Sequence, residues 1–256
     1  TRMGRIDIPL EPFAARGIYI PFGLLTLPER VDALLNLVSN SEELNAIVVD
    51  VKGDYARIAW PSDLPLAQEI GAYQQDVMDL GQLLAECEKR DIYAIARMVV
   101  FKDSLLAENR PDLAIQVQGG GLYRDNEGSH WMDPFEQEVR DYNIGLALEV
   151  TEMGFDEVQF DYLRFPSWGS MSQRVYDQEC TFETRTRAME TFCAQAYDAM
   201  RLTPAFLSAD IFGLTVWVDP ARDMGIGQRV DDIAPHVDYI SPMLYPQTFG
   251  PGNLGF

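Results

Sequence analysis

The chain has 256 residues, of which 47% are hydrophobic, and 40 acidic against 20 basic side chains give it a formal net charge of −20. This length and apolar content suffice for one α/β barrel or two smaller domains. Nucleic acids and anionic membrane surfaces both require a basic surface on their partner, so the charge argues against both. No run of about 18 apolar residues occurs, and no membrane span is expected.

The cysteines do not predict a metal site or a disulfide framework. Cys87, Cys180 and Cys193 show neither a CxxC motif nor zinc-ligand spacing, and their odd number leaves room for one bridge at most. The chain has only two histidines, which also argues against a histidine-rich metal site. We therefore expect no metal and no cofactor. The first residue is Thr1, and a signal or anchor is expected upstream of it.

Six predicted strands alternate with helical segments along the chain. The strands are residues 17–23, 45–52, 92–102, 157–166, 205–213 and 239–246, all rich in apolar, β-branched or aromatic residues. Apolar residues at helical spacing predict helices around residues 31–38, 77–87, 135–146, 189–200 and 230–234.

Two local signals refine this order of elements. Thr26 and Glu29 have the spacing of a capping box, which predicts the start of the first helix. The longest insertion, about residues 103–133, is expected to contain a hairpin that turns at residues 125–128.

Apolar strands that alternate with amphipathic helices predict a parallel sheet covered by helices, in a single domain over residues 1–256. An open doubly wound sheet would need only the six strands. A (β/α)8 TIM barrel would need eight, so its last two units would be missing from this chain. Residues 21–23 (PFG) lack the glycine-rich fingerprint of a nucleotide site, which weakens the open-sheet alternative.

Ionisable and polar groups recur near the C-terminal ends of the predicted strands, where parallel α/β folds place their sites. Burying a carboxylate is costly unless it is paired or functional, so an acid inside an apolar strand is a candidate catalytic group. Asp161 and Asp210 are such acids. The complete set of candidates is Asp50, Lys52, Arg97, Asp161, Arg164, Asp210 and Tyr245.

The structural alternative for each acid is an ion pair or a hydrogen bond to a loop amide. Arg164 is a candidate partner for Asp161, and Asp50 with Lys52 is a candidate buried pair that shapes the cleft. Alternation along residues 157–166 predicts that Asp161 faces the barrel mouth while Phe160 packs under the helices.

All four tryptophans fall in loops that follow predicted strands. Flat aromatic rings around a polar cleft suit stacking on sugar rings, although a single loop tryptophan more often packs the loop itself. Two carboxylates on adjacent strands are the minimal apparatus of glycoside hydrolysis. The tryptophans predicted to bind substrate are Trp60, Trp131, Trp168 and Trp217.

These motifs resemble those of a family of bacterial glycoside hydrolases that was long described only as a domain of unknown function. The similar segments include AIVVDVKGDYARIAW, EVQFDYLRFP, SADIFG and DYISPMLYP, and they extend over nearly the whole chain. The family is assigned to the (β/α)8 glycosidase superfamily that includes the α-amylase-like enzymes. The resemblance implies that Asp161 is the nucleophile, that Asp210 is the acid/base, and that two further strands follow.

We therefore expect a hydrolase that acts on an oligo- or polysaccharide with Asp161 and Asp210. Family members are typically exported or attached to the cell envelope, which implies an extracellular or envelope location. Two alternatives stay open: a carbohydrate-binding protein on a barrel scaffold without catalysis, and a metal-dependent hydrolase or lyase. In the latter, Asp50, Asp161 and Asp210 would be the oxygen ligands of Mg²⁺ or Ca²⁺.

Overall fold

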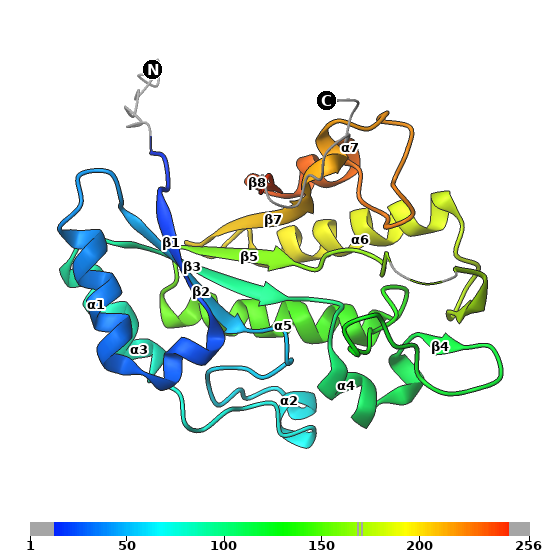
Figure 1. Ribbon diagram of the computed structural model, residues 1–256, viewed down its shortest axis with the longest axis horizontal. Coiled ribbons are helices and arrows are strands. Elements are labelled where there is room, and N and C mark those ends of the chain that lie inside the picture. The colour runs from blue at the N-terminus through cyan, green and yellow to red at the C-terminus, as the bar shows by residue number, and fades with distance from the viewer. Residues whose placement is uncertain (1–12, 168, 170, 246–256) are drawn as a thin grey trace, which may run out of the picture.

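The computed structural model describes residues 13–167, 169 and 171–245. Six parallel strands form one sheet in their chain order and curl into a half-barrel (Figure 1). This order matches an incomplete (β/α)8 barrel, as predicted, and not a doubly wound sheet. The strands are β1 (Gly17–Ile20), β2 (Ala46–Lys52), β3 (Tyr93–Val99), β5 (Glu157–Asp161), β7 (Phe206–Phe212) and β8 (Tyr239–Met243).

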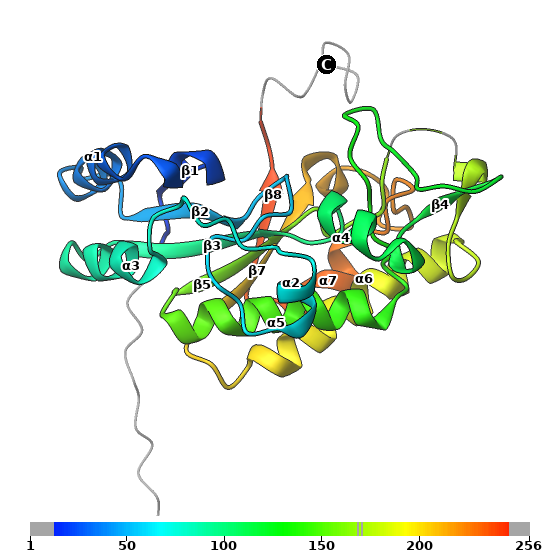
Figure 2. The ribbon, with the colours of Figure 1, turned by 90° about the horizontal axis from the view of Figure 1, so that it is seen from below.

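Four long helices cover the outer face of the sheet (Figure 2). Helix α1 (Pro28–Ser39) packs on β1 and β2, α3 (Leu80–Lys89) on β3, α5 (Gln137–Met153) on β5 and α6 (Phe182–Met200) on β7. The ring of Phe160 in β5 lies 5.0 Å from that of Phe192 in α6. Phe160 therefore packs under the helices, as the alternation of β5 predicted.

Short elements fill the connections. They are the helices α2 (Pro65–Glu69), α4 (Ser104–Asn109) and α7 (Val230–Ile233), the strands β4 (Gln116–Val117) and β6 (Arg174–Val175), and the 3₁₀ helices η1 (Phe22–Thr26), η2 (Pro111–Leu113), η3 (Met171–Gln173), η4 (Gly213–Val216) and η5 (Ala234–His236).

The insertion after β3 contains more structure than a hairpin. It holds α4 and β4, and β4 pairs with β6 in an antiparallel ribbon over the C-terminal side of the sheet. The expected turn at residues 125–128 is present, with the Gly128 N–H donating to the Asp125 carbonyl at 3.1 Å.

Two local predictions differ from the structure. The Thr26–Glu29 capping box is wrong, because Thr26 belongs to η1 and its hydroxyl donates to the Gly23 carbonyl at 2.9 Å; α1 starts at Pro28 without a side-chain cap. The strand expected over residues 157–166 ends at Asp161, because Tyr162 adopts a left-handed backbone conformation with φ of +51°. No disulfide forms, since all three cysteines are free.

Candidate functional site

Arg97 is the centre of an ionic cluster on the inner face of the half-barrel. From β3 it reaches both neighbouring strands: Nη1 lies 2.5 Å from Asp50 Oδ1 on β2, and Nε lies 3.0 Å from Asp161 Oδ2 on β5. Nη2 donates to the same Asp161 oxygen. The Arg97 side chain is only 12% exposed, so it pairs the two carboxylates in a largely desolvated setting.

Asp50 has little freedom left for chemistry. One of its oxygens accepts from Arg97, and the other accepts from the Tyr19 hydroxyl and, at 3.4 Å, from the Phe22 N–H. Burial raises the pKa of Asp50, while Arg97 and Tyr19 oppose this rise. These contacts suit a residue that orients Arg97. Tyr19 was not among the predicted site residues, because a tyrosine in a first strand carries no sequence signal for this role.

The end of β5 fixes the carboxylate of Asp161. The left-handed turn at Tyr162 directs its own N–H to Asp161 Oδ1 at 2.5 Å. Together with Nε and Nη2 of Arg97, this N–H surrounds Asp161 with three donors. Charge-assisted hydrogen bonds of this kind stabilise the ionised carboxylate.

Asp210 lies beside Asp161 but in a different environment. The register pairs Phe160 with Ala209, so the next residues, Asp161 and Asp210, stand at the same level of strands about 4.8 Å apart. Burial and then the charge of Asp161 raise the pKa of Asp210 well above its usual range, against weaker opposing effects of Arg97 and Ser241. The geometry thus brings together a carboxyl group held by three N–H donors and a neighbouring carboxyl group with a raised pKa.

The raised pKa of Asp210 predicts how stability should depend on pH. A raised pKa means that the folded state binds the Asp210 proton more tightly than the unfolded state, whose pKa is about 3.9. The ionisable carboxyl therefore costs stability progressively as the pH rises above about 4. Asp210→Asn should raise the melting temperature relative to wild type at pH 8, and this gain should shrink towards pH 4.

Thermal denaturation of both proteins between pH 4 and 8 measures this effect. Asp198→Asn on α6 is the matched control, because its side chain is 81% exposed and its effect should not vary with pH. A difference between Asp210→Asn and wild type that stays constant over this range would contradict the raised pKa.

Gln228 joins β5 and β7 beyond the end of their ladder. Its side chain is buried, and Nε2 donates to the carbonyls of Leu163 at 3.0 Å and Asp210 at 3.3 Å, while Oε1 accepts from the Phe212 N–H at 2.8 Å. The side-chain amide of Gln228 therefore provides hydrogen bonds to three backbone groups around the two acids. Sequence reasoning missed Gln228, since no motif marks it.

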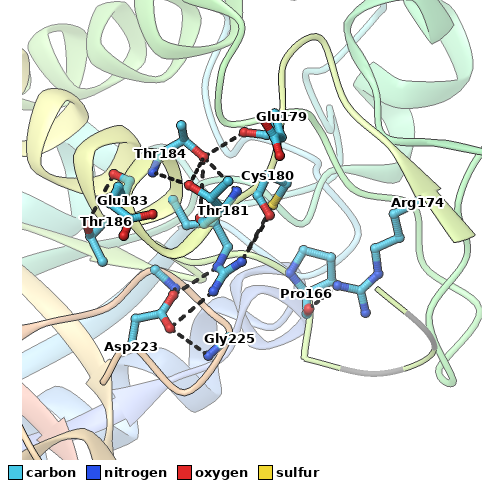
Figure 3. Close-up of polar contacts among 12 residues, drawn as sticks. Pro166, Arg174, Glu179, Cys180, Thr181, Glu183, Thr184, Thr186, Asp223 and Gly225 are labelled. Carbon is cyan, nitrogen blue, oxygen red and sulfur yellow. Dashed lines mark hydrogen bonds and ion pairs between the residues drawn. The ribbon is translucent and has the colours of Figure 1, made fainter. Parts of the chain in front are cut away.

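The loop that carries Gln228 is tied to the start of α6. Asp223 pairs with Arg185 at 2.9 Å and accepts from the Gly225 N–H at 3.0 Å, as Figure 3 shows around Asp223 and Gly225. Gly227 has φ of +81°, and an added Cβ would lie 3.0 Å from the Arg185 carbonyl oxygen. This close approach of loop and helix holds Gln228 at the site.

Lys52 lies away from the Asp161–Asp210 pair. An irregularity between Asp50 and Lys52 shifts the register of β2 against β3. Lys52 is fully buried, 2.8 Å from Asp103, and it also donates to the Val99 carbonyl at 2.7 Å. The pairing of Asp50 with Lys52 suggested by the sequence is not present, because each residue has its own partner of opposite charge.

Arg164 does not pair with Asp161, whose cationic partner is Arg97. Its guanidinium group instead stacks on the rings of Trp131 and Tyr162, at 5.1 and 5.2 Å from their centres. Tyr245 does lie near the two acids. Burial, Asp210 and Asp161 all raise the pKa of its hydroxyl.

The tryptophans do not share one environment. Trp60 is buried, and its indole N–H donates to Glu149 of α5 at 2.8 Å, which identifies a packing role. Trp131 is also buried and donates to Asp125 at 2.8 Å. Trp217 is 52% exposed, and Trp168 lies outside the described residues.

The described residues contain no group of three or more His, Cys, Asp or Glu side chains placed to hold a metal ion. Arg97 occupies the space between Asp50 and Asp161 that a shared cation would need. A cavity of about 820 Å³ lies at the opposite, N-terminal end of the strands, where Asn45, Tyr93 and Asp156 line it. Within the described ranges, no helix has the length and apolarity required to cross a bilayer.

The chain resembles several solved structures. A hypothetical protein from Ruminiclostridium thermocellum ATCC 27405 is 32% identical, with a TM-score of 0.66 over 75% of this chain and 96% of that one. A family 20 exo-β-N-acetylglucosaminidase from Vibrio harveyi is 17% identical, with a TM-score of 0.55 over 77% of this chain and 35% of the enzyme. An α-galactosidase from Thermus thermophilus is 16% identical, with a TM-score of 0.51 over 78% of this chain and 39% of the enzyme.

The two enzymes share the fold with this chain, which spans little more than a third of their length. No curated protein sequence matches the chain. The family model described as "Putative glycosyl hydrolase domain" matches residues 17–256. With its parallel half-barrel and a carboxyl pair at one end of neighbouring strands, the chain belongs to this glycosyl hydrolase domain family.

Proposed function

We propose that the protein hydrolyses glycosidic bonds, with Asp161 as nucleophile or general base and Asp210 as general acid. The observation that carries the proposal is the contrast between two neighbouring carboxyl groups. Three N–H donors surround the Asp161 carboxyl group, whereas burial and the charge of Asp161 raise the pKa of Asp210. Glycosidases require one carboxyl group of each kind on either side of the scissile bond.

In the proposed reaction, Asp210 gives its proton to the glycosidic oxygen as the C–O bond breaks. Asp161 supports the oxocarbenium-like transition state and either bonds to the anomeric carbon or takes a proton from the attacking water. The same-level position of the two acids on neighbouring strands favours the first course. Enzymes that form such a covalent bond retain the anomeric configuration and hold their two carboxyl groups about 5–5.5 Å apart, whereas inverting enzymes hold them about 6.5–9.5 Å apart.

Arg97 contributes through Asp161 and Asp50. It pairs with both carboxyl groups in the resting site, and it fixes the Asp161 oxygen on which Nε and Nη2 converge. The substrate that we propose is an oligo- or polysaccharide, in an extracellular or cell-envelope location. The family resemblance supports both of these assignments.

The leaving group of the substrate tests the role of Asp210. An aryl glycoside with a poor leaving group needs protonation, so Asp210→Asn should lower its kcat by about 10²-fold or more. The dinitrophenolate group of a dinitrophenyl glycoside departs without protonation, so Asp210→Asn should lower kcat on this substrate far less. In wild type, kcat/KM for the poor leaving group should fall as the pH rises through the elevated pKa of Asp210.

Steady-state rates of wild type and Asp210→Asn on both classes of glycoside, in both anomers, supply the measurement. Equal losses on good and poor leaving groups would remove Asp210 as the acid. Glycan binding without any turnover by wild type would contradict catalysis and favour the carbohydrate-binding alternative.

A further inference from the structure

Arg164 is a cation close to the proposed catalytic pair that the proposed chemistry does not use. It follows Asp161 by three residues and stacks on Trp131 and Tyr162, whose rings meet edge to face at 5.7 Å. Asp125 holds the indole of Trp131, and the N–H of Tyr162 is bonded to Asp161. The two rings therefore fix the guanidinium group at a defined place beside Asp161.

One edge of this guanidinium group has no hydrogen-bond partner among the described residues. Nη1 makes long bonds of 3.3 Å to the Phe165 carbonyl and the Ser167 hydroxyl. Nε and Nη2 donate to no described residue. Neither nitrogen is one of the fully buried side-chain atoms that lack a hydrogen-bond partner. An arginine edge with two parallel N–H groups matches both oxygens of a carboxylate.

Within the described part of the chain, Arg164 also lacks a direct ion-pair partner, since Asp161, Asp125 and Glu127 act on its charge only from a longer distance. Arg97 meets two aspartates and Arg185 meets Asp223, but no carboxylate of the described residues lies within ion-pair distance of Arg164. Burial accordingly lowers the pKa of Arg164. Lys102 lies 4.7 Å from the centre of the Tyr162 ring, and Glu127 already neutralises it. A bound anion would supply a direct ion-pair partner.

We propose that Arg164 recognises the carboxylate of an acidic sugar, such as a uronic acid, in a subsite next to Asp161 and Asp210. The inference rests on the proposed function, because this sugar would belong to the glycan that the pair cleaves. The net charge of −20 repels polyanions at long range, so the subsite would confer selectivity at contact rather than fast association.

Matched aryl glycosides test the subsite. Glucuronide is compared with glucoside, and galacturonide with galactoside, in both anomers, on wild type, Arg164→Gln and Arg164→Lys. We expect wild type to prefer one uronide over its neutral partner by about 10- to 100-fold in kcat/KM, the range of a charge-assisted hydrogen-bond pair. Arg164→Gln should abolish this preference by lowering kcat/KM for the uronide far more than for the neutral substrate, while Arg164→Lys should retain part of the preference.

Arg124→Gln is the matched control, because this exposed arginine lies in the same insertion as Trp131. It should keep the preference of wild type. A preference for the neutral partner in both pairs, or a uronide preference that survives Arg164→Gln, would overturn the proposal. A 6-sulfated glucoside that outperforms the glucuronide would also overturn it, since the subsite would then select a tetrahedral anion.

A binding measurement separates failure of the subsite from failure of the proposed function. Oligogalacturonate and oligoglucuronate are titrated into the Asp161→Asn variant, with and without Arg164→Gln, by calorimetry. Binding that is lost with Arg164→Gln supports the subsite even if no glycoside is hydrolysed, an outcome that would refute the proposed function alone. Absence of uronate binding together with hydrolysis of neutral glycosides would refute the subsite alone.

Discussion

Asp161→Asn should lower kcat on all glycosides by about 10⁴-fold or more, whatever their leaving group. Removal of a covalent nucleophile typically costs more than removal of an acid, because no other group forms the intermediate. Asparagine keeps the shape, but its single carbonyl oxygen can accept from Arg97 or from the Tyr162 N–H and not from both. The loss would therefore report on the missing charge and on one lost hydrogen bond, and a dinitrophenyl substrate should not rescue it.

Steady-state kinetics of wild type and Asp161→Asn supply the measurement, with circular dichroism spectra to show that the fold is kept. Asp198→Asn, the same change on the exposed side of α6, should retain the wild-type rate. A slowly hydrolysed 2-fluoro glycoside should label Asp161 covalently, and mass spectrometry of the peptide identifies the site. A rate within tenfold of wild type for Asp161→Asn would remove the assignment.

Lys52→Met should destabilise the protein by about 3–5 kcal/mol, the cost of leaving one member of a buried ion pair without its partner. Lys52 and Asp103 are both fully buried and lie 2.8 Å apart. Without the ammonium group, the Asp103 carboxylate would remain in a setting that cannot solvate it. The Val99 carbonyl and Asn143 would also each lose a hydrogen-bond donor.

Urea denaturation at pH 7 measures this free energy. The double variant Lys52→Met with Asp103→Asn should recover much of the loss, because asparagine is uncharged and can still cap α4 through the Leu106 N–H. Lys89→Met removes an exposed partner of Glu86 and should change stability by about 0.5 kcal/mol or less. Similar losses for Lys52→Met and Lys89→Met would show that the buried pair contributes little.

Periodicity along the chain predicted the strands and helices of the half-barrel, while the family resemblance favoured the barrel over an open sheet. Each strand needs an apolar surface towards its helices, so the runs at residues 45–52 and 205–213 predicted β2 and β7 to within a residue. The end of β5 was not predictable in this way. The positive φ of Tyr162 is held by tertiary contacts and by its bond to Asp161, whereas the apolar sequence continues to Phe165.

Residue identity alone located the acids and Arg97, because a charged side chain inside an apolar strand is energetically costly and therefore indicates a candidate site residue. It could not assign partners. Arg164 is closer than Arg97 to Asp161 in sequence, yet the register of β3 and β5 brings Arg97 to it. A strand irregularity separates Lys52 from Asp50, and the loop tryptophans that looked equivalent lie in different environments.

The sequence by itself determined the alternation of strands and helices, the net negative charge and the position of Asp161 and Asp210 near matching strand ends. These features follow from hydrophobic periodicity and charge, which are local properties of the chain. Only the tertiary structure decided that Arg97 pairs with Asp161 while burial raises the pKa of Asp210, and that Gln228 ties their strands together. Ion pairing and desolvation depend on neighbours distant in sequence, so they emerge only when the strands assemble.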